Sequence, residues 1–127
     1  MLNFEAVPGQ VLKRRKDVFV WHMGIYTGRG TVIDTVPTNG TSERSLADFA
    51  DGKEVLDGGY PGNLQNWLVV ENAKRMIGEA YSFARSNCEH LVSQAHGLKK
   101  SSPQLQILAA FGVITLIAFA MAQTKKP

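Results

Sequence analysis

The segment Val18–Tyr26 alternates along its length and is largely apolar on both of the faces that the alternation creates. One face carries Val18, Val20, His22, Gly24 and Tyr26, and the other carries Phe19, Trp21, Met23 and Ile25. A strand of this kind is buried on both sides, so we expect it to be central in its sheet. The turn residues Gly28-Arg29-Gly30 predict that the chain returns as an antiparallel neighbour over Thr31–Val36.

The other segments are expected to complete a small antiparallel sheet packed on helices, which is an α+β fold. The remaining strands are expected after Val7-Pro8-Gly9, at the edge segments Ser45–Phe49 and Lys53–Leu56, and at Trp67–Val69. Loops are expected at Pro37–Ser42 and Asp57–Asn63, where turn-forming residues are frequent. Apolar spacing predicts one helix from Glu71 to Ala84 and another from Cys88 to Gly97.

Cys88 is the only cysteine among 127 residues, which excludes an internal disulfide and favours a reducing setting. It falls in the first turn of the second predicted helix, and Asn87 before it is a good N-cap residue. The positive end of the helix dipole lowers the pKa of a thiol placed there, so we expect a nucleophilic thiolate. The alternative is that Cys88 is a small buried hydrophobe.

A thiol nucleophile needs a base that takes its proton and later returns it to a leaving group. His22 is the candidate, although a histidine in a core strand can also be a hydrogen-bonded structural residue. His90 points about 200° around the helix from Cys88, which makes it a poor base, and we expect a structural role. His96 is expected at the end of the same helix, where the dipole favours a cation.

Three motifs together resemble the lecithin:retinol acyltransferase-like family of the circularly permuted, NlpC-like papain fold. They are His22-Met23-Gly24-Ile25-Tyr26-Thr27-Gly28, a second strand running from Val32-Ile33 to Pro37, and Asn87-Cys88-Glu89-His90. The resemblance covers roughly residues 6 to 104. The chain is most similar to the small phospholipase A and acyltransferase enzymes of the H-Ras-like suppressor group, followed by related H-box and NC proteins of some viruses.

The resemblance implies that Cys88 carries an acyl thioester and that His22 is the general base and acid. Asp34 occupies the position where the small lipid enzymes usually have a second histidine, and an aspartate can orient His22 and stabilise its imidazolium form. The alternative for Asp34 is a strand-end carboxylate that faces water. Asn87 and Gln104 are the expected auxiliary residues near the oxyanion, which helix N-terminal N–H groups would hold.

The function implied is transfer of an acyl chain from a glycerophospholipid to Cys88 and then to water, an amine or a hydroxyl. This would make the protein a phospholipase A1/A2 and O/N-acyltransferase. No cofactor is implied, and no metal-type pair of Cys or His residues is present. Two alternatives remain, a thiol peptidase or amidase of the same fold and a catalytically idle membrane-bound adaptor.

The segment Leu105–Ala122 has no charged residue over 18 positions. As a helix it would be roughly 27 Å long, slightly short of the ~30 Å hydrocarbon core of a bilayer. We expect a C-terminal tail anchor that holds a catalytic domain, residues 1–104, on the cytoplasmic face of an intracellular membrane, with 123–127 as a short basic tail. A buried helix of a soluble protein is the alternative.

Charge argues against a nucleic-acid-binding domain. Of the 14 Lys and Arg residues, Lys125 and Lys126 lie beyond the apolar segment, which leaves 12 against 11 Asp and Glu. The cluster Lys13-Arg14-Arg15-Lys16 is expected at the tip of a hairpin. There it would either contact lipid phosphates or form an ordinary solvated loop.

Overall fold

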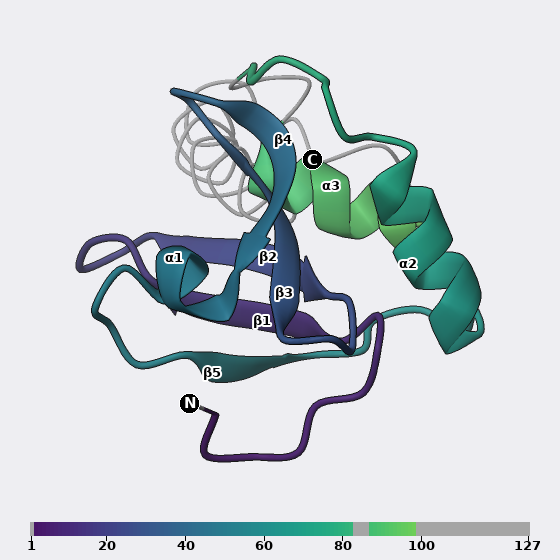
Figure 1. Cartoon of the computed structure of the whole chain (residues 1–127), viewed down its shortest axis with the longest axis horizontal. Helices are drawn as coiled ribbons and strands as arrows, with labels where there is room; N and C mark the ends of the chain where they lie inside the picture. The colour runs from purple at the N-terminus through teal and green to yellow at the C-terminus, as the bar shows by residue number, and fades with distance from the viewer. Residues whose placement is uncertain (1, 83–86, 99–127) are drawn as a thin grey trace, which may run out of the picture.

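The computed structural model describes residues 2–82 and 87–98, which form an α+β fold (Figure 1). The elements in chain order are β1 (Val11–Arg15), β2 (Trp21–Tyr26), β3 (Thr31–Val36), β4 (Gly40–Ser45), α1 (Leu46–Ala50), β5 (Leu56–Gly59), α2 (Asn66–Lys74) and α3 (Cys88–Ala95). The sheet order is β4-β3-β2-β1-β5, and every neighbouring pair is antiparallel. The expectation that the strand carrying His22 is central is therefore confirmed.

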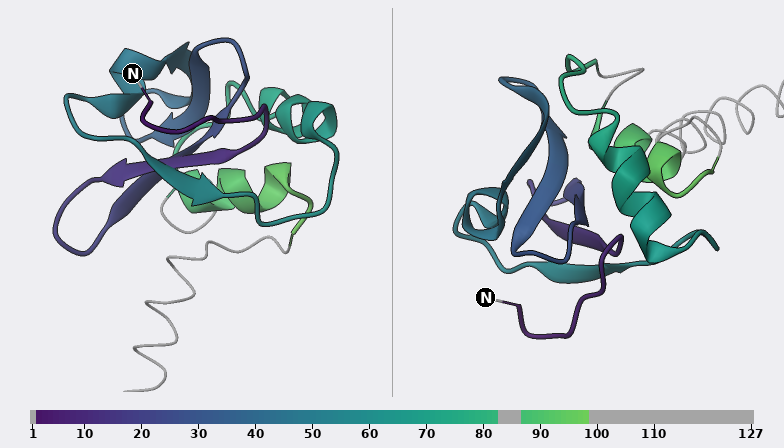
Figure 2. Two further views of the ribbon diagram at one scale, coloured as in Figure 1. Left: turned by 90° about the horizontal axis from the view of Figure 1, so that it is seen from below. Right: turned by 45° about the vertical axis from the view of Figure 1, so that its right-hand side comes forward.

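The sheet packs a core on each of its faces. On one face, β-strand side chains such as Val11 and Ile25 meet α2 and α3, where Leu91 is fully buried. On the other face, Leu12 and Val32 meet Phe49 of α1. Figure 2, in its right-hand view, shows α1 on one side of the sheet and α2 and α3 on the other.

Close packing around β2 explains why position 24 is a glycine. A Cβ on Gly24 would lie 2.5 Å from Cγ1 of Val32 and 2.9 Å from the carbonyl oxygen of Ile33. Real Cβ atoms do not approach other heavy atoms so closely, so a larger residue would push α1 and β3 away. The same absence of a side chain leaves room for the ring of Phe49, whose centroid is 5.4 Å from that of His22.

The first hairpin turns later than the sequence predicts. Lys13, Arg14 and Arg15 are strand residues of β1, and the turn runs from Lys16 to Val20, whose backbone groups are joined by a hydrogen bond of 2.8 Å. The prediction that Lys13–Lys16 forms the hairpin tip is therefore wrong, because the basic residues continue the ladder of β1 with β2.

Between β3 and β5 the predicted strand and loop positions are exchanged. The expected loop at 37–42 contains the start of β4, and the expected strand at Ser45–Phe49 is the short helix α1. Ser45 caps α1, because its side chain accepts a hydrogen bond from the backbone N–H of Asp48 at 3.0 Å. Strand β5 similarly begins at the end of the expected strand and runs into the expected glycine-rich loop.

Helix α2 begins earlier and ends earlier than predicted. Trp67–Val69 belongs to this helix rather than to the sheet, and the helix stops at Lys74. The following segment instead hydrogen-bonds the start of β4, with Gly78 N donating to Thr41 O at 2.9 Å and Thr41 N donating to Glu79 O at 2.8 Å. These backbone bonds to β4 replace those that a longer helix would have made.

Several predictions fall outside the described residues. They include Gln104, the apolar segment 105–122 and the basic tail 123–127. Within 2–82 and 87–98, no helix has the length and apolar character needed to cross a bilayer.

Candidate functional site

His22 and Asp34 are brought together by the pairing of β2 with β3. Gly24 lies opposite Asp34 in the register, so His22 is diagonal to Asp34 on the face that packs against α1. Nε2 of His22 lies 2.7 Å from Oδ2 of Asp34, and both side chains are buried. Since an ionised carboxylate only accepts hydrogen bonds, the geometry assigns the proton to Nε2 of the imidazole.

Asp34 is held from its other side by Arg44 of β4. Nε of Arg44 lies 2.9 Å from Oδ1 and 3.0 Å from Oδ2, and Nη2 lies 2.5 Å from Oδ2. Burial alone would raise the pKa of Asp34, but the hydrogen bonds from His22 and Arg44 outweigh it and hold that pKa below its ordinary value. Asp34 is therefore an ionised, fully buried carboxylate rather than a strand-end group that faces water.

Cys88 is the first residue of α3, as the sequence predicts. Asn87 is the N-cap, and its side-chain oxygen accepts the N–H of His90 at 2.8 Å. Gly97, with φ of 73°, follows the helix in the left-handed conformation that ends helices. Because the side-chain oxygen of Asn87 is used as the cap, its Nδ2 group is the only part of the side chain that could donate to a bound oxyanion.

The pairing of β2 with β3 stops short of Met23, and we call the place where these two strands part the notch. Tyr26 N donates to Gln10 O of the segment before β1, so the N–H of Met23, three residues earlier, points to the opposite side, toward β3. Pairing of β2 with β3 ends at Gly24 and Asp34, so no described strand residue accepts this N–H.

The sulfur of Cys88 lies at this notch, in surroundings that disfavour the thiolate. Burial raises the pKa of the Cys88 thiol, and the carboxylate of Glu89 raises it further, whereas the backbone N–H of Met23 and the charge of Lys16 act in the opposite direction. The thiol donates to Oε2 of Glu89 at 3.2 Å. The expected lowered pKa is therefore wrong in this structure, because burial and a neighbouring anion outweigh the helix dipole.

Cys88 and His22 approach the notch from opposite sides of the sheet. α3 packs on the face that carries Met23, while His22 lies on the face of α1. Among the described residues no hydrogen bond joins the thiol to the imidazole. Asp34 occupies Nε2, and none of the described residues hydrogen-bonds Nδ1, so this nitrogen is the one that could receive a proton from the thiol.

The four predicted lipid-contact residues separate into two groups. Arg14 is buried on the α1 face, where its Nε donates to the carbonyl oxygen of Phe49 at 2.8 Å, so it is not available to a lipid phosphate. Lys13 and Arg15 lie on the opposite face over the ring of Trp21, and Lys16 is exposed at the turn. Only Lys13, Arg15 and Lys16 remain as candidates.

His96 is the C-cap of α3, at the helix end where the sequence predicts it, but it is not the cation that the helix dipole would favour there. Its ring is almost fully buried, and Nε2 lies 2.7 Å from the carbonyl oxygen of Gly9. Burial lowers the pKa of His96, while the hydrogen bond to Gly9 acts against that shift. Its Nδ1 is buried with no hydrogen-bond partner among the described residues. His96 is therefore a neutral structural residue that ties α3 to the chain before β1.

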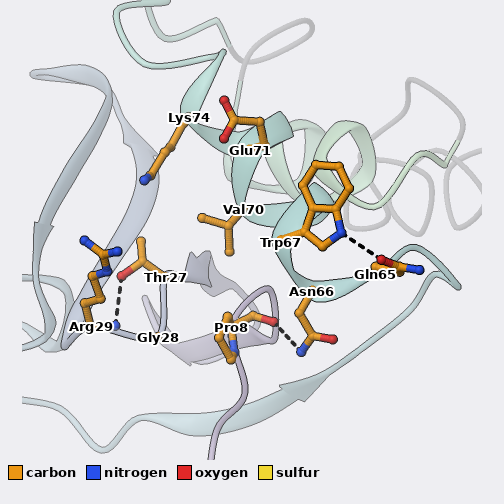
Figure 3. A pocket seen from close by; sticks show the side chains of 10 residues that line it. All are labelled: Pro8, Thr27, Gly28, Arg29, Gln65, Asn66, Trp67, Val70, Glu71 and Lys74. Carbon is orange, nitrogen blue, oxygen red and sulfur yellow. Dashed lines mark hydrogen bonds between the residues drawn. The ribbon is translucent and has the colours of Figure 1, made fainter.

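A separate hollow of about 640 Å³ lies between α2 and the β2–β3 turn (Figure 3). Its lining residues are Pro8, Thr27, Gly28, Arg29, Gln65, Asn66, Trp67, Val70, Glu71 and Lys74. None of the predicted catalytic residues is among them. Within the described parts of the chain, no three His, Cys, Asp or Glu side chains are grouped so that they could hold a metal ion.

Two residues of the site were missed by sequence reasoning. Arg44 could have been found only with the register of β4, which places it diagonal to Asp34 on the neighbouring strand. Glu89 stands next to Cys88 in the sequence, but its effect depends on burial of the pair.

No protein-family model matches the chain, and none of the curated proteins matches it.

Proposed function

We propose that this protein is a thiol acyl-transfer enzyme in which Cys88 takes an acyl chain from a glycerophospholipid and passes it to water or to an amine or hydroxyl acceptor. The observation that carries the proposal is the arrangement at the notch. His22, bonded through Nε2 to a buried carboxylate, is adjacent in β2 to Met23, whose backbone interacts with the Cys88 sulfur.

In the first step the Cys88 sulfur attacks the ester carbonyl carbon, and a carbon–sulfur bond forms while the ester carbon–oxygen bond breaks. The thiol proton moves to Nδ1 of His22 and from there to the leaving oxygen of the lysophospholipid. Asp34 stabilises the imidazolium that exists between these transfers. Because the resting thiol is neutral, we expect proton removal and attack to occur together rather than from a preformed thiolate.

In the second step water or another acceptor attacks the thioester carbonyl carbon. His22 removes a proton from the acceptor and returns one to the departing sulfur, so the free thiol is regenerated. In both steps the oxyanion would be stabilised at the start of α3, where the backbone N–H of Cys88 has no acceptor within the helix.

The proposal that the substrate is a lipid rests on the motifs around His22 and Cys88, which resemble those of the lecithin:retinol acyltransferase-like family. The circularly permuted papain-like topology and the tail anchor at 105–122 are parts of the same proposal. An anchor would confine the enzyme to the surface where its substrate lies, which raises the effective concentration without any new contact at the site.

The raised pKa of Cys88 favours one alternative, a protein that keeps the fold but performs no thiol chemistry. An assay for fatty acid and lysophospholipid released from phospholipid in mixed detergent micelles decides between the acyl-transfer enzyme and the protein without thiol chemistry. We expect release by the full chain and none by Cys88→Ser or His22→Ala. Equal release by the wild type and Cys88→Ser would exclude the proposed nucleophile, and cleavage of peptide amides alone would favour a peptidase.

A further inference from the structure

The turn between β1 and β2 exposes two adjacent large apolar side chains. Val18 is 71% exposed and Phe19 is 86% exposed. Figure 2, in its left-hand view, shows this connection projecting beyond the end of the sheet. Single exposed apolar residues are ordinary on protein surfaces, but two neighbours at the tip of a projecting hairpin form a small apolar wedge.

Hydrogen bonds hold the backbone of this turn in place. Oδ1 of Asp17 accepts the backbone N–H of Phe19 at 2.9 Å and that of Val20 at 3.0 Å. Nη1 of Arg15 donates to the carbonyl oxygen of Val18 at 2.5 Å. The exposure of Val18 and Phe19 is thus part of an ordered turn, and the carboxylate of Asp17 is engaged by the backbone.

Cations surround the base of the wedge. Nζ of Lys13 lies 4.5 Å from the centre of the Trp21 ring, and Cζ of Arg15 lies 4.6 Å from it. Lys16 is exposed at the start of the turn, and Asp17 is the only acidic residue between Val11 and Tyr26. The hairpin end therefore combines a positive surface, an aromatic ring and a projecting apolar tip.

We propose that this hairpin end, Lys13 and Arg15–Trp21, docks on the surface of an anionic lipid bilayer, with Phe19 and Val18 inserted among the headgroups. A convex tip needs a shaped cavity to be buried in a protein partner, whereas a bilayer interface accepts it without one. Lys13, Arg15 and Lys16 would then face lipid phosphates, and Trp21 would lie at the level where aromatic rings are enriched.

The position of the hairpin explains what docking would do for the enzyme. This part of the inference rests on the proposed function. Trp21, Lys13 and Arg15 lie on the same face of the sheet as α3, and Lys16 is close enough to lower the pKa of the Cys88 thiol against the larger effect of burial. Docking through this end would therefore bring the start of α3 to the lipid surface.

The test uses the full chain with Cys88→Ser, so that a single new cysteine can carry an environment-sensitive fluorophore. Phe19→Cys places the label at the tip, and Thr38→Cys places it at another exposed turn, between β3 and β4. Both proteins retain residues 99–127, so any association through that segment is the same in both. Vesicles of phosphatidylcholine with and without phosphatidylserine are compared, with nitroxide lipids as quenchers, and circular dichroism verifies folding.

We expect the label at position 19 to shift to shorter wavelength and to be quenched on phosphatidylserine vesicles, while the label at 38 stays in water. Replacing Lys16 with serine should weaken the lipid-dependent signal about fivefold at low salt, and 0.5 M salt should weaken it further. A label at 19 that remains as accessible to water as the label at 38 on bound vesicles would overturn the proposal. Equal insertion into uncharged vesicles would overturn the role of the cations.

These readouts do not depend on catalysis. Insertion of the tip without lipid hydrolysis by the wild type would support the docking and contradict the proposed function. Lipid hydrolysis without insertion would support the proposed function and contradict the docking.

Discussion

Asp34 accepts a hydrogen bond from Nε2 of His22 at 2.7 Å while its side chain is fully buried in the sheet. Arg44 binds the same carboxylate through Nε and Nη2, so the orientation of the imidazole is fixed by a cation two strands away from it. A buried charge of this kind is tolerated only where it is paired and hydrogen-bonded, as it is here.

Asp34→Asn should reduce acyl transfer by about 10²-fold, and Asp34→Ala should reduce it further. The amide oxygen of Asn can still accept a hydrogen bond from Nε2–H of His22, but it carries no charge that stabilises the imidazolium. Alanine offers neither the hydrogen bond nor the charge. The measurement is kcat for fatty-acid release in mixed micelles. Wild-type activity in Asp34→Ala would show that another group holds His22.

Arg44→Ala should lower activity, and Arg44→Lys should restore part of it. Without the guanidinium, Asp34 loses the partner that fixes its carboxylate, so the imidazole of His22 is held less firmly in position. The measurement is kcat for fatty-acid release in mixed micelles, with thermal unfolding recorded for each variant. Wild-type kcat in a folded Arg44→Ala protein would show that Arg44 does not position the site.

Glu89→Gln should increase the rate at which Cys88 is alkylated by iodoacetamide near neutral pH. The carboxylate raises the pKa of the thiol, so its removal lowers that pKa and moves the onset of alkylation to lower pH. Glu71→Gln, on the exposed side of α2, is the matched control and should leave the rate unchanged. An unaltered pH dependence in Glu89→Gln would refute the assigned effect.

The fold should lose stability as the pH falls below about 6.5, the ordinary pKa of histidine. Burial lowers the pKa of His96, so the unfolded chain binds its proton first and protonation favours unfolding. Thermal unfolding at pH 7.5 and pH 5.5 measures this loss. In His96→Gln the difference between the two pH values should shrink, and a difference as large as in the wild type would assign it to other groups.

Those parts of the fold with long periodic segments could be predicted from the sequence. The apolar alternation around His22 identified the central strand, and Asn87 and Gly97 marked the ends of α3. The short elements between residues 37 and 74 could not be placed, because α1 has five residues and β5 has four. Elements of that length depend on tertiary hydrogen bonds, such as those between Thr41 and the Gly78–Glu79 segment, more than on local preference.

The positions of the candidate site residues could be predicted better than their electrostatics. The His22–Asp34 contact follows from two adjacent strands, and the position of Cys88 follows from helix capping. The state of the thiol depends on how deeply it is buried and on which way Glu89 points, and neither is written in the residue pattern. The burial of Arg14 is not written in the residue pattern either. Neighbouring residues of a strand point to opposite faces, so Arg14 points away from Lys13 and Arg15.

The central claim is that Cys88 becomes covalently acylated by a phospholipid. The most direct measurement is mass spectrometry of the full chain after brief incubation with phosphatidylcholine of a single acyl type and an acid quench, followed by peptide fragmentation. We predict a mass increase of one acyl group located on Cys88, absent in His22→Ala and removed by hydroxylamine. Release of fatty acid without any adduct on Cys88, or an adduct located elsewhere, would contradict the account.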